Sequence, residues 1–202
     1  MKISAAPVAL TGKRERKHPL AGHGPIVDRA RQGLRLTAAQ FGAVLDTDHT
    51  SVRVLTQDGI ELTLSYEPGN YVFSRVYALT ITTRLPAGAA VPRGVKLSHR
   101  GAQRGGTFVP ERETSPAPAA LGRLNAAAAA HLGGIDMVRA TVGVSGDRGS
   151  LTLSPMGGAF VWVLIPPVFK STAFPPGEPE RILDLIRALR DLAPAATHSP
   201  SA

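Results

Sequence analysis

A basic loop at residues 93–106 (RGVKLSHRGAQRGG) is the stretch whose residue types point most directly to chemistry. Its charged and imidazole side chains are Arg93, Lys96, His99, Arg100 and Arg104. Glycine-rich backbone and cationic side chains together bind phosphate and other anions. These residues are therefore candidates for anion binding, as is Arg75, which interrupts an otherwise apolar strand face and is either buried beside an anionic partner or exposed where the strand begins only at Val76. For the 93–106 loop the favoured interpretation is an exposed loop whose arginines reflect the codon usage of a GC-rich bacterial genome, with anion binding as the functional alternative.

Other groupings of polar residues do not form a catalytic or metal-binding pattern. The DTDH stretch (46–49) offers two carboxylates and an imidazole, but a metal site needs further ligands that nothing in the sequence identifies. Ser145 is near Asp147, although GVSGD is not a nucleophile elbow and precedes a hairpin. The chain has no Cys, which excludes a thiolate nucleophile and a Cys-based zinc site. We predict no catalytic residue, no metal and no cofactor.

The positive charge of the chain is unevenly distributed. The net charge is +8, and the excess lies in residues 1–27, with the run KRERKH, and in residues 68–110, which hold six bases and no acid. Both segments could attract nucleic acid, although the arm lacks the interleaved aromatic residues that stack on bases. No stretch reaches the roughly 20 apolar residues that span a bilayer. We expect a cytoplasmic protein without a transmembrane segment.

The elements expected to position these residues follow from hydrophobic periodicity. We predict three regions along the chain: a flexible basic arm over 1–24, a single α+β domain over 25–193, and a disordered tail over 194–202. A capping-box pattern at Thr37 and Gln40 predicts a helix over 38–45. Alternating residues predict strands, with turns at EPGN (67–70) and PMGG (155–158). Further helices are predicted at 120–132 and, from the apolar stripe after Pro179, near the C-terminus.

An internal similarity suggests how these elements combine. Residues 58–73 align with 147–162 without a gap, with seven identities in sixteen positions. We predict half-repeats over 25–85 and 118–167, each a helix followed by three strands, although hairpins of similar composition would also align. The predicted fold is an α+β protein with an antiparallel sheet of about six strands, helices on one face and a C-terminal amphipathic helix. The opposite face would carry the polar side chains of Glu61, Thr63, Ser65, Arg139, Thr141, Ser145, Thr152 and Ser154.

These observations favour a bacterial binding module for a protein partner or a small ligand, rather than an enzyme. Such a module could also form a homodimer that shields the polar face. One alternative is binding of nucleic acid or a phosphate anion through the arm and the 93–106 loop. Another is an enzyme for an acidic or phosphorylated substrate, with Arg100 and Arg104 holding the anion.

Overall fold

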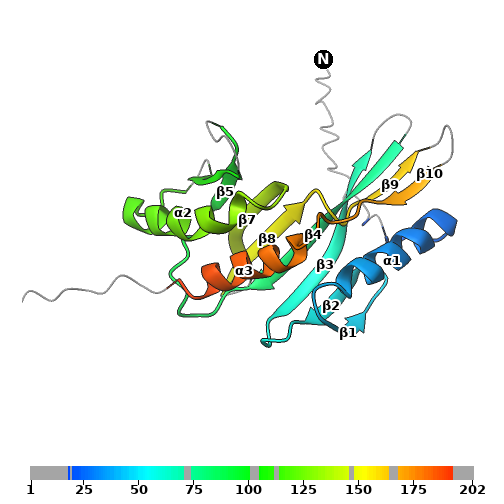
Figure 1. Ribbon diagram of the computed structural model, residues 1–202, viewed down its shortest axis with the longest axis horizontal. Coiled ribbons are helices and arrows are strands. Elements are labelled where there is room, and N and C mark those ends of the chain that lie inside the picture. Colours follow the sequence, from blue (N-terminus) through cyan, green and yellow to red (C-terminus); the bar gives the residue numbers. More distant parts are fainter. Residues whose placement is uncertain are drawn as a thin grey trace, which may run out of the picture.

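The computed structural model describes residues 18, 20–70, 74–100, 105–111, 114–145, 148–163 and 168–192. In this part of the chain ten strands form one antiparallel sheet, and three helices pack against it (Figure 1). The helices are α1 (Pro25–Ala38), α2 (Pro118–Leu132) and α3 (Glu178–Arg190). The strands are β1 (Ala43–Thr47), β2 (Ser51–Leu55), β3 (Glu61–Asn70), β4 (Ser74–Arg84), β5 (Val95–Ser98), β6 (Thr107–Pro110), β7 (Met137–Ser145), β8 (Arg148–Pro155), β9 (Phe160–Val163) and β10 (Val168–Ser171).

The sheet is organised around the long strand β4. The main path of hydrogen-bonded strands runs β1-β2-β3-β4-β8-β7-β5-β6. Strand β9 also pairs with β4, and β10 pairs with β9. The first half of β4 therefore bonds to β9 and its second half to β8. Ile81 pairs with Leu153, and Tyr77 pairs with Phe160. Between these two pairs, the three residues 78–80 of β4 lie opposite the six residues 154–159, which join β8 to β9.

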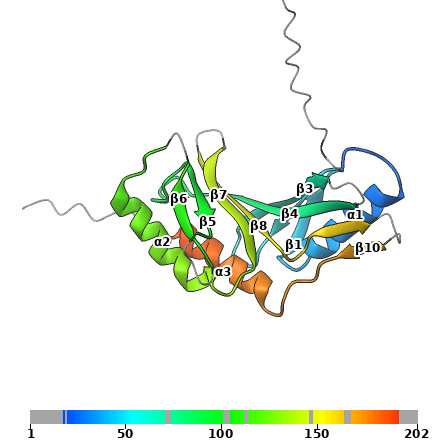
Figure 2. The same cartoon turned by 90° about the horizontal axis from the view of Figure 1, so that it is seen from above.

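The core follows from the alternation of apolar residues that the sequence shows. In β3, Leu62, Leu64 and Tyr66 are buried, as are Tyr77, Leu79 and Ile81 in β4. These side chains pack with the apolar stripe of α3, formed by Ile182, Leu185, Ile186 and Leu189. Helix α1 contacts β2, β3 and β9, while α2 lies beside α3 and contacts β6 (Figure 2). Removal of this apolar area from water is the main force that joins helices to sheet.

The predicted six-stranded sheet, made of two helix–three-strand units with helices on one face, is wrong. The sheet has ten strands; four follow α1, four follow α2, and the β5–β6 hairpin lies between them. The two similar segments also have different surroundings. Strand β3 pairs with the strand that follows it, whereas β8 pairs with β7 and β4 and not with β9. The predicted turn at 67–70 is part of β3, and Pro68 pairs with Tyr77.

The structure also corrects a local prediction. The helix expected over 38–45 does not form: α1 continues through Thr37 to Ala38, and β1 begins at Ala43. Thr37 is buried in the last turn of α1, on the face that also carries Leu34, so the apolar stripe extends through the expected cap. Strand β10 lies off the main path of strands and pairs with β9. The C-terminal helix is confirmed, with Pro179 in its first turn.

Candidate functional site: an arginine-flanked cavity

The predicted anion-binding residues are spread over the molecule. Arg75 is exposed at the beginning of β4, where it pairs with Trp162 of β9. Lys96 is exposed on β5, which is separated from β4 by β7 and β8. His99 follows β5, and its Nδ1 lies 2.7 Å from the carbonyl oxygen of Gly105. Arg100 is exposed, and Arg104 lies outside the described residues. The structure therefore does not bring Arg75 together with His99 and Arg100.

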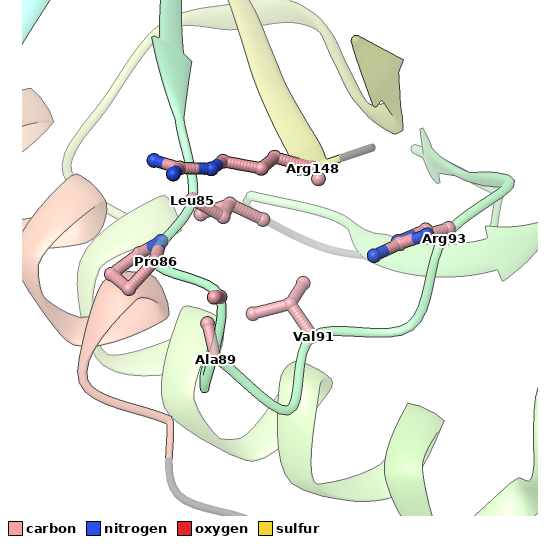
Figure 3. A pocket seen from close by; sticks show the side chains of 8 residues that line it. Leu85, Pro86, Ala89, Val91, Arg93 and Arg148 are labelled. Carbon is pink, nitrogen blue, oxygen red and sulfur yellow. The ribbon is translucent and has the colours of Figure 1, made fainter. Parts of the chain in front are cut away.

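Arg93 lines a small cavity at one end of the sheet. The cavity has a volume of about 90 Å³ and is lined by Leu85, Pro86, Ala87, Ala89, Val91, Arg93, Arg148 and Gly149. Figure 3 shows the Arg148 side chain running above Leu85 and Pro86, while Arg93 lies on the other side of the cavity, beyond Val91. The two guanidinium groups come from different elements, because Arg148 begins β8 and Arg93 precedes β5. The cavity combines two cations with an apolar floor.

Backbone contacts fix the segment that forms this floor. The amide of Leu85 donates to the carbonyl of Gly149 at 2.8 Å, and the amide of Ala90 donates to the carbonyl of Leu192, just after α3, at 2.8 Å. A Cβ on Gly149 would lie 3.1 Å from Leu85, so a larger residue there would crowd the floor. The segment that follows β4 is therefore held between the beginning of β8 and the end of α3.

Size and charge decide which group could occupy the cavity. Sites for drug-sized ligands commonly measure about 300–1,000 Å³, so this cavity suits a single functional group or a very small molecule. A guanidinium presents a planar set of donors that matches a carboxylate or a phosphate. Among the described residues, none forms a hydrogen bond or ion pair with the side chain of Arg148. Arg148 is thus available to an anion.

Sequence reasoning placed Arg93 among the anion-binding candidates but missed Arg148. In the sequence Arg148 is one residue of the turn-like stretch GDRG, and no local pattern distinguishes it. Its role becomes visible only once the residues after β4 pass next to the beginning of β8.

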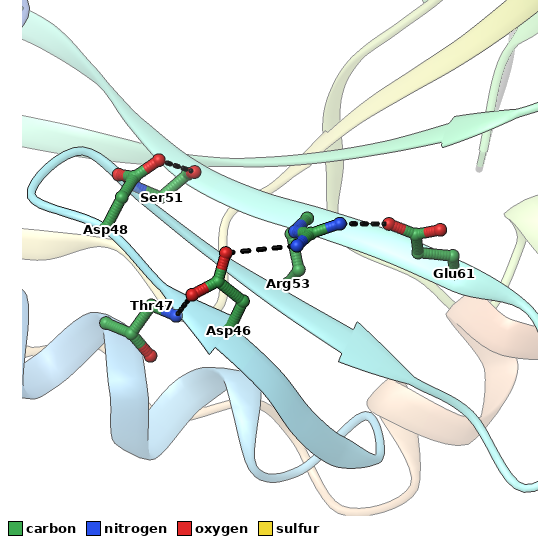
Figure 4. A network of polar contacts seen from close by, with 6 residues as sticks. All are labelled: Asp46, Thr47, Asp48, Ser51, Arg53 and Glu61. Carbon is green, nitrogen blue, oxygen red and sulfur yellow. Dashed lines mark hydrogen bonds and ion pairs between the residues drawn. The ribbon is translucent and has the colours of Figure 1, made fainter.

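The DTDH stretch has a structural role (Figure 4). The Asp48 carboxylate accepts hydrogen bonds from the amides of Thr50 at 2.5 Å and Ser51 at 2.6 Å, and closes the β1–β2 turn. These bonds, led by the one from Thr50, lower the pKa of Asp48 to about 2. Asp46 instead forms an ion pair with Arg53 at 3.0 Å. The described residues contain no group of three or more His, Cys, Asp or Glu placed to hold a metal ion.

The side of the sheet opposite the core carries a row of polar side chains. Strand register places Thr63, Thr82, Thr152 and Thr141 next to one another across β3, β4, β8 and β7. The Oγ1 atoms of Thr82 and Thr152 lie 3.4 Å apart. Glu67 and Arg139 form an ion pair on this side. Of the positions predicted for this face, Glu61 and Arg139 are exposed and Thr63, Ser65, Thr141 and Thr152 are partly exposed. The prediction fails at Ser154, which is buried. The burial of Ser145 lies outside what the structure describes.

The carboxyl group of Glu178 is buried at the beginning of α3. Its side chain has 0% exposure, and its Oε1 accepts a hydrogen bond from the amide of Asp136 at 2.7 Å. Burial raises the pKa of Glu178, and the nearby charge of Asp136 acts in the same direction, whereas Arg181 and the amide bond oppose it. In the sequence, Glu178 was interpreted only as a favourable charge near a helix N-terminus.

We expect Glu178→Gln to stabilise the protein increasingly as the pH rises. A raised folded-state pKa contributes stability below the unfolded-state pKa, and that contribution is lost as the pH rises through the folded-state pKa. Glutamine stays neutral and can still accept the Asp136 amide bond. Thermal unfolding should show nearly equal Tm values at pH 4 and a Tm a few degrees higher for Glu178→Gln at pH 7.5.

Glu180→Gln is the matched control, because Glu180 is exposed in the same helical turn. Its Tm should follow that of the unmodified protein at both pH values. A Glu178→Gln variant less stable than the unmodified protein at pH 7.5 would show that the buried carboxylate is not under an electrostatic penalty.

The fold and the arginine-flanked cavity define the class of this molecule: an α+β protein built on a ten-stranded antiparallel sheet, with a small cationic cavity at one end of that sheet. Residues 39–193, which run from the turn before β1 to just beyond α3, match the family described as "Protein of unknown function (DUF3156)". The match covers more than half of the chain, which belongs to this family. Comparison with curated proteins and with solved structures found no match. None of the helices in the described part is long and apolar enough to cross a membrane.

Proposed function

We propose that the protein is a binding module for a small ligand that carries a carboxylate or phosphate group, and that this group occupies the cavity between Arg93 and Arg148. The observation that supports the proposal is the placement of two guanidinium side chains, from β8 and from the segment before β5, around an apolar floor. Leu85 and Val91 would contact the ligand's apolar carbons while the guanidinium group of Arg148 holds its charge and Arg93 adds positive charge to the rim.

The distribution of the other cations favours this site over a nucleic-acid surface. Arg75 lies at the β9 end of β4, and Lys96 and Arg100 lie at β5 and beyond it. Binding of a duplex requires cations placed along a continuous path of phosphates. Arg75 and Lys96 lie on strands that β8 and β7 separate, and residues 1–17 of the basic arm, on which the nucleic-acid alternative also depends, lie outside the described residues. We therefore propose the cavity in preference to a nucleic-acid surface.

Calorimetric titration with inorganic phosphate and with butyrate tests the proposal. We expect binding in the millimolar range, about −4 kcal/mol, because the cavity holds one group and is open to water. Arg148→Gln should weaken binding about tenfold or more, which corresponds to about 1.4 kcal/mol. Added salt should weaken binding as well, since partly exposed charges are screened.

Arg75→Gln provides the control, because it removes the same charge from an exposed position far from the cavity. Its affinity should match that of the unmodified protein. Equal loss of affinity in Arg75→Gln and Arg148→Gln would mean that the anion responds to net charge alone, and this outcome would overturn the proposal. Binding of duplex DNA with no effect of Arg148→Gln would also overturn it.

A further inference from the structure

A larger cavity of opposite charge lies at the beginning of α3. It has a volume of about 440 Å³ and is lined by Gly105, Gly133, Gly134, Ile135, Asp136, Pro175 and Glu178. This volume is within the range of about 300–1,000 Å³ that is common for small-molecule sites. The segment that lines the arginine-flanked cavity is bonded through the Ala90 amide to Leu192, beyond the other end of α3, and a helix of this length spans about 20 Å. The two cavities are therefore separate sites.

The cavity contains a buried carboxyl group that is only half satisfied. Glu178 is fully buried, and its Oε1 is bonded to the amide of Asp136, but its Oε2 has no hydrogen-bond partner among the described residues. A buried polar atom without a partner costs about 1–3 kcal/mol, so a ligand that supplies a donor would gain that free energy. The Asp136 side chain lines the same cavity and is exposed.

We propose that this cavity binds the primary ammonium group of a small aliphatic amine, with Glu178 and Asp136 as its two carboxyl partners. An ammonium group donates three hydrogen bonds, one of which the unpartnered Oε2 of Glu178 can accept. Ile135 and Pro175 provide apolar contacts for the aliphatic chain. A Cβ on Gly133 would meet no atom within 4 Å, so this wall leaves space for the chain.

An ammonium group fits better than a metal ion. Calcium takes six to eight oxygen ligands, whereas the cavity offers two carboxyl groups. The Gly134 carbonyl, which could have been a further ligand, already accepts a hydrogen bond from Arg181 Nη1 at 3.2 Å. The described residues contain no cluster of three or more metal-ligating side chains here or elsewhere.

Titration of the full chain with butylammonium chloride at pH 7.5, followed by calorimetry at constant ionic strength, tests this inference. We expect millimolar binding of butylammonium, no measurable binding of butanol, and no measurable binding of calcium chloride. Butanol has a similar carbon chain without the charge, and calcium supplies charge without the chain. Glu178→Gln should weaken butylammonium binding at least tenfold, while Glu180→Gln, an exposed change in the same helical turn, should leave it unaltered.

Three outcomes would overturn the inference. These are equal binding of butanol and butylammonium, calcium binding that Glu178→Gln abolishes, and an unchanged affinity for butylammonium in Glu178→Gln. Circular dichroism checks that the variant is folded. If it is not, Asp136→Asn gives the same test, because the Asp136 side chain is exposed and its amide, not its carboxylate, bonds to Glu178. Failure here leaves the arginine-flanked site untouched, since the two cavities share no lining residue.

Discussion

Replacing Gly42 by alanine is expected to lower the free energy of unfolding by about 3 kcal/mol or more. Gly42 lies between α1 and β1 with a φ of 157°. A Cβ at this position would lie 2.2 Å from the carbonyl oxygen of Leu55 and 2.8 Å from its carbonyl carbon. Leu55 pairs with Ala43 in the β1–β2 ladder, so its backbone cannot withdraw without disrupting that ladder. Tm should fall by on the order of 10 °C, measured by circular dichroism.

Gly122→Ala is the control for this change, and its expected effect has the opposite sign. Gly122 is exposed within α2, and a Cβ there would meet no atom within 4 Å. Alanine is the better helix former by roughly 0.5–1 kcal/mol, so Gly122→Ala should stabilise the protein. If the free energy of unfolding of Gly42→Ala lay within about 0.5 kcal/mol of that of the unmodified protein, the inferred close contact between Gly42 and the Leu55 backbone would be contradicted.

The sequence predicts those parts of the fold that depend on local periodicity. The apolar stripe of Ile182, Leu185, Ile186 and Leu189 predicts α3, and the alternation of Leu62, Leu64 and Tyr66 predicts the buried side of β3; all seven residues are buried. In both cases a single element shows the whole signal, because the period of 3.6 or of two residues is repeated within it.

Strand pairing is not predictable in the same way. The stretch PMGG predicts a turn between two paired strands, yet β8 and β9 both pair with β4. Which strands become neighbours depends on β4 being long enough to accept two partners in succession. The Thr37–Gln40 pattern fails for a related reason, since the buried face of α1 extends through Thr37 and outweighs the local capping preference.

The candidate sites show the same division between local and tertiary information. Arg93 is recognisable because it lies in a basic, glycine-rich segment, but its partner Arg148 lies 55 positions further along the chain. Glu178 looks like an ordinary residue of a helical first turn. It becomes a buried carboxyl group only because the turn after α2 packs over it and donates the Asp136 amide. Cavities arise from contacts between elements, and no spacing within one element encodes them.

Gly158→Ala is expected to destabilise the protein by about 2–4 kcal/mol, from backbone strain and from overpacking. Gly158 belongs to the segment that joins β8 to β9 and has a φ of 74°. A Cβ there would lie 2.7 Å from Leu79 Cδ2 and 2.9 Å from Thr37 Cγ2. The Gly158 carbonyl also accepts a hydrogen bond from the Tyr66 hydroxyl at 3.1 Å. One added methyl group would therefore disturb the contact between α1, β3 and β4, and urea denaturation should show a lower midpoint with an unchanged slope.

Gly143→Ala in β7 is the control for Gly158→Ala. A Cβ at Gly143 would meet no atom within 4 Å, so this variant shows the effect of replacing a glycine without any steric clash. Its expected change is small and favours the folded state, since alanine restricts the unfolded chain more than glycine does. Gly69, which the sequence alignment equates with Gly158, lies within β3, where Pro68 and Gly69 pair with Tyr77 and Val76. Equal destabilisation by Gly69→Ala and Gly158→Ala would indicate that the two glycines have equivalent roles. The difference that we expect follows from their distinct positions, one in a paired strand and the other at the point where β4 changes partner.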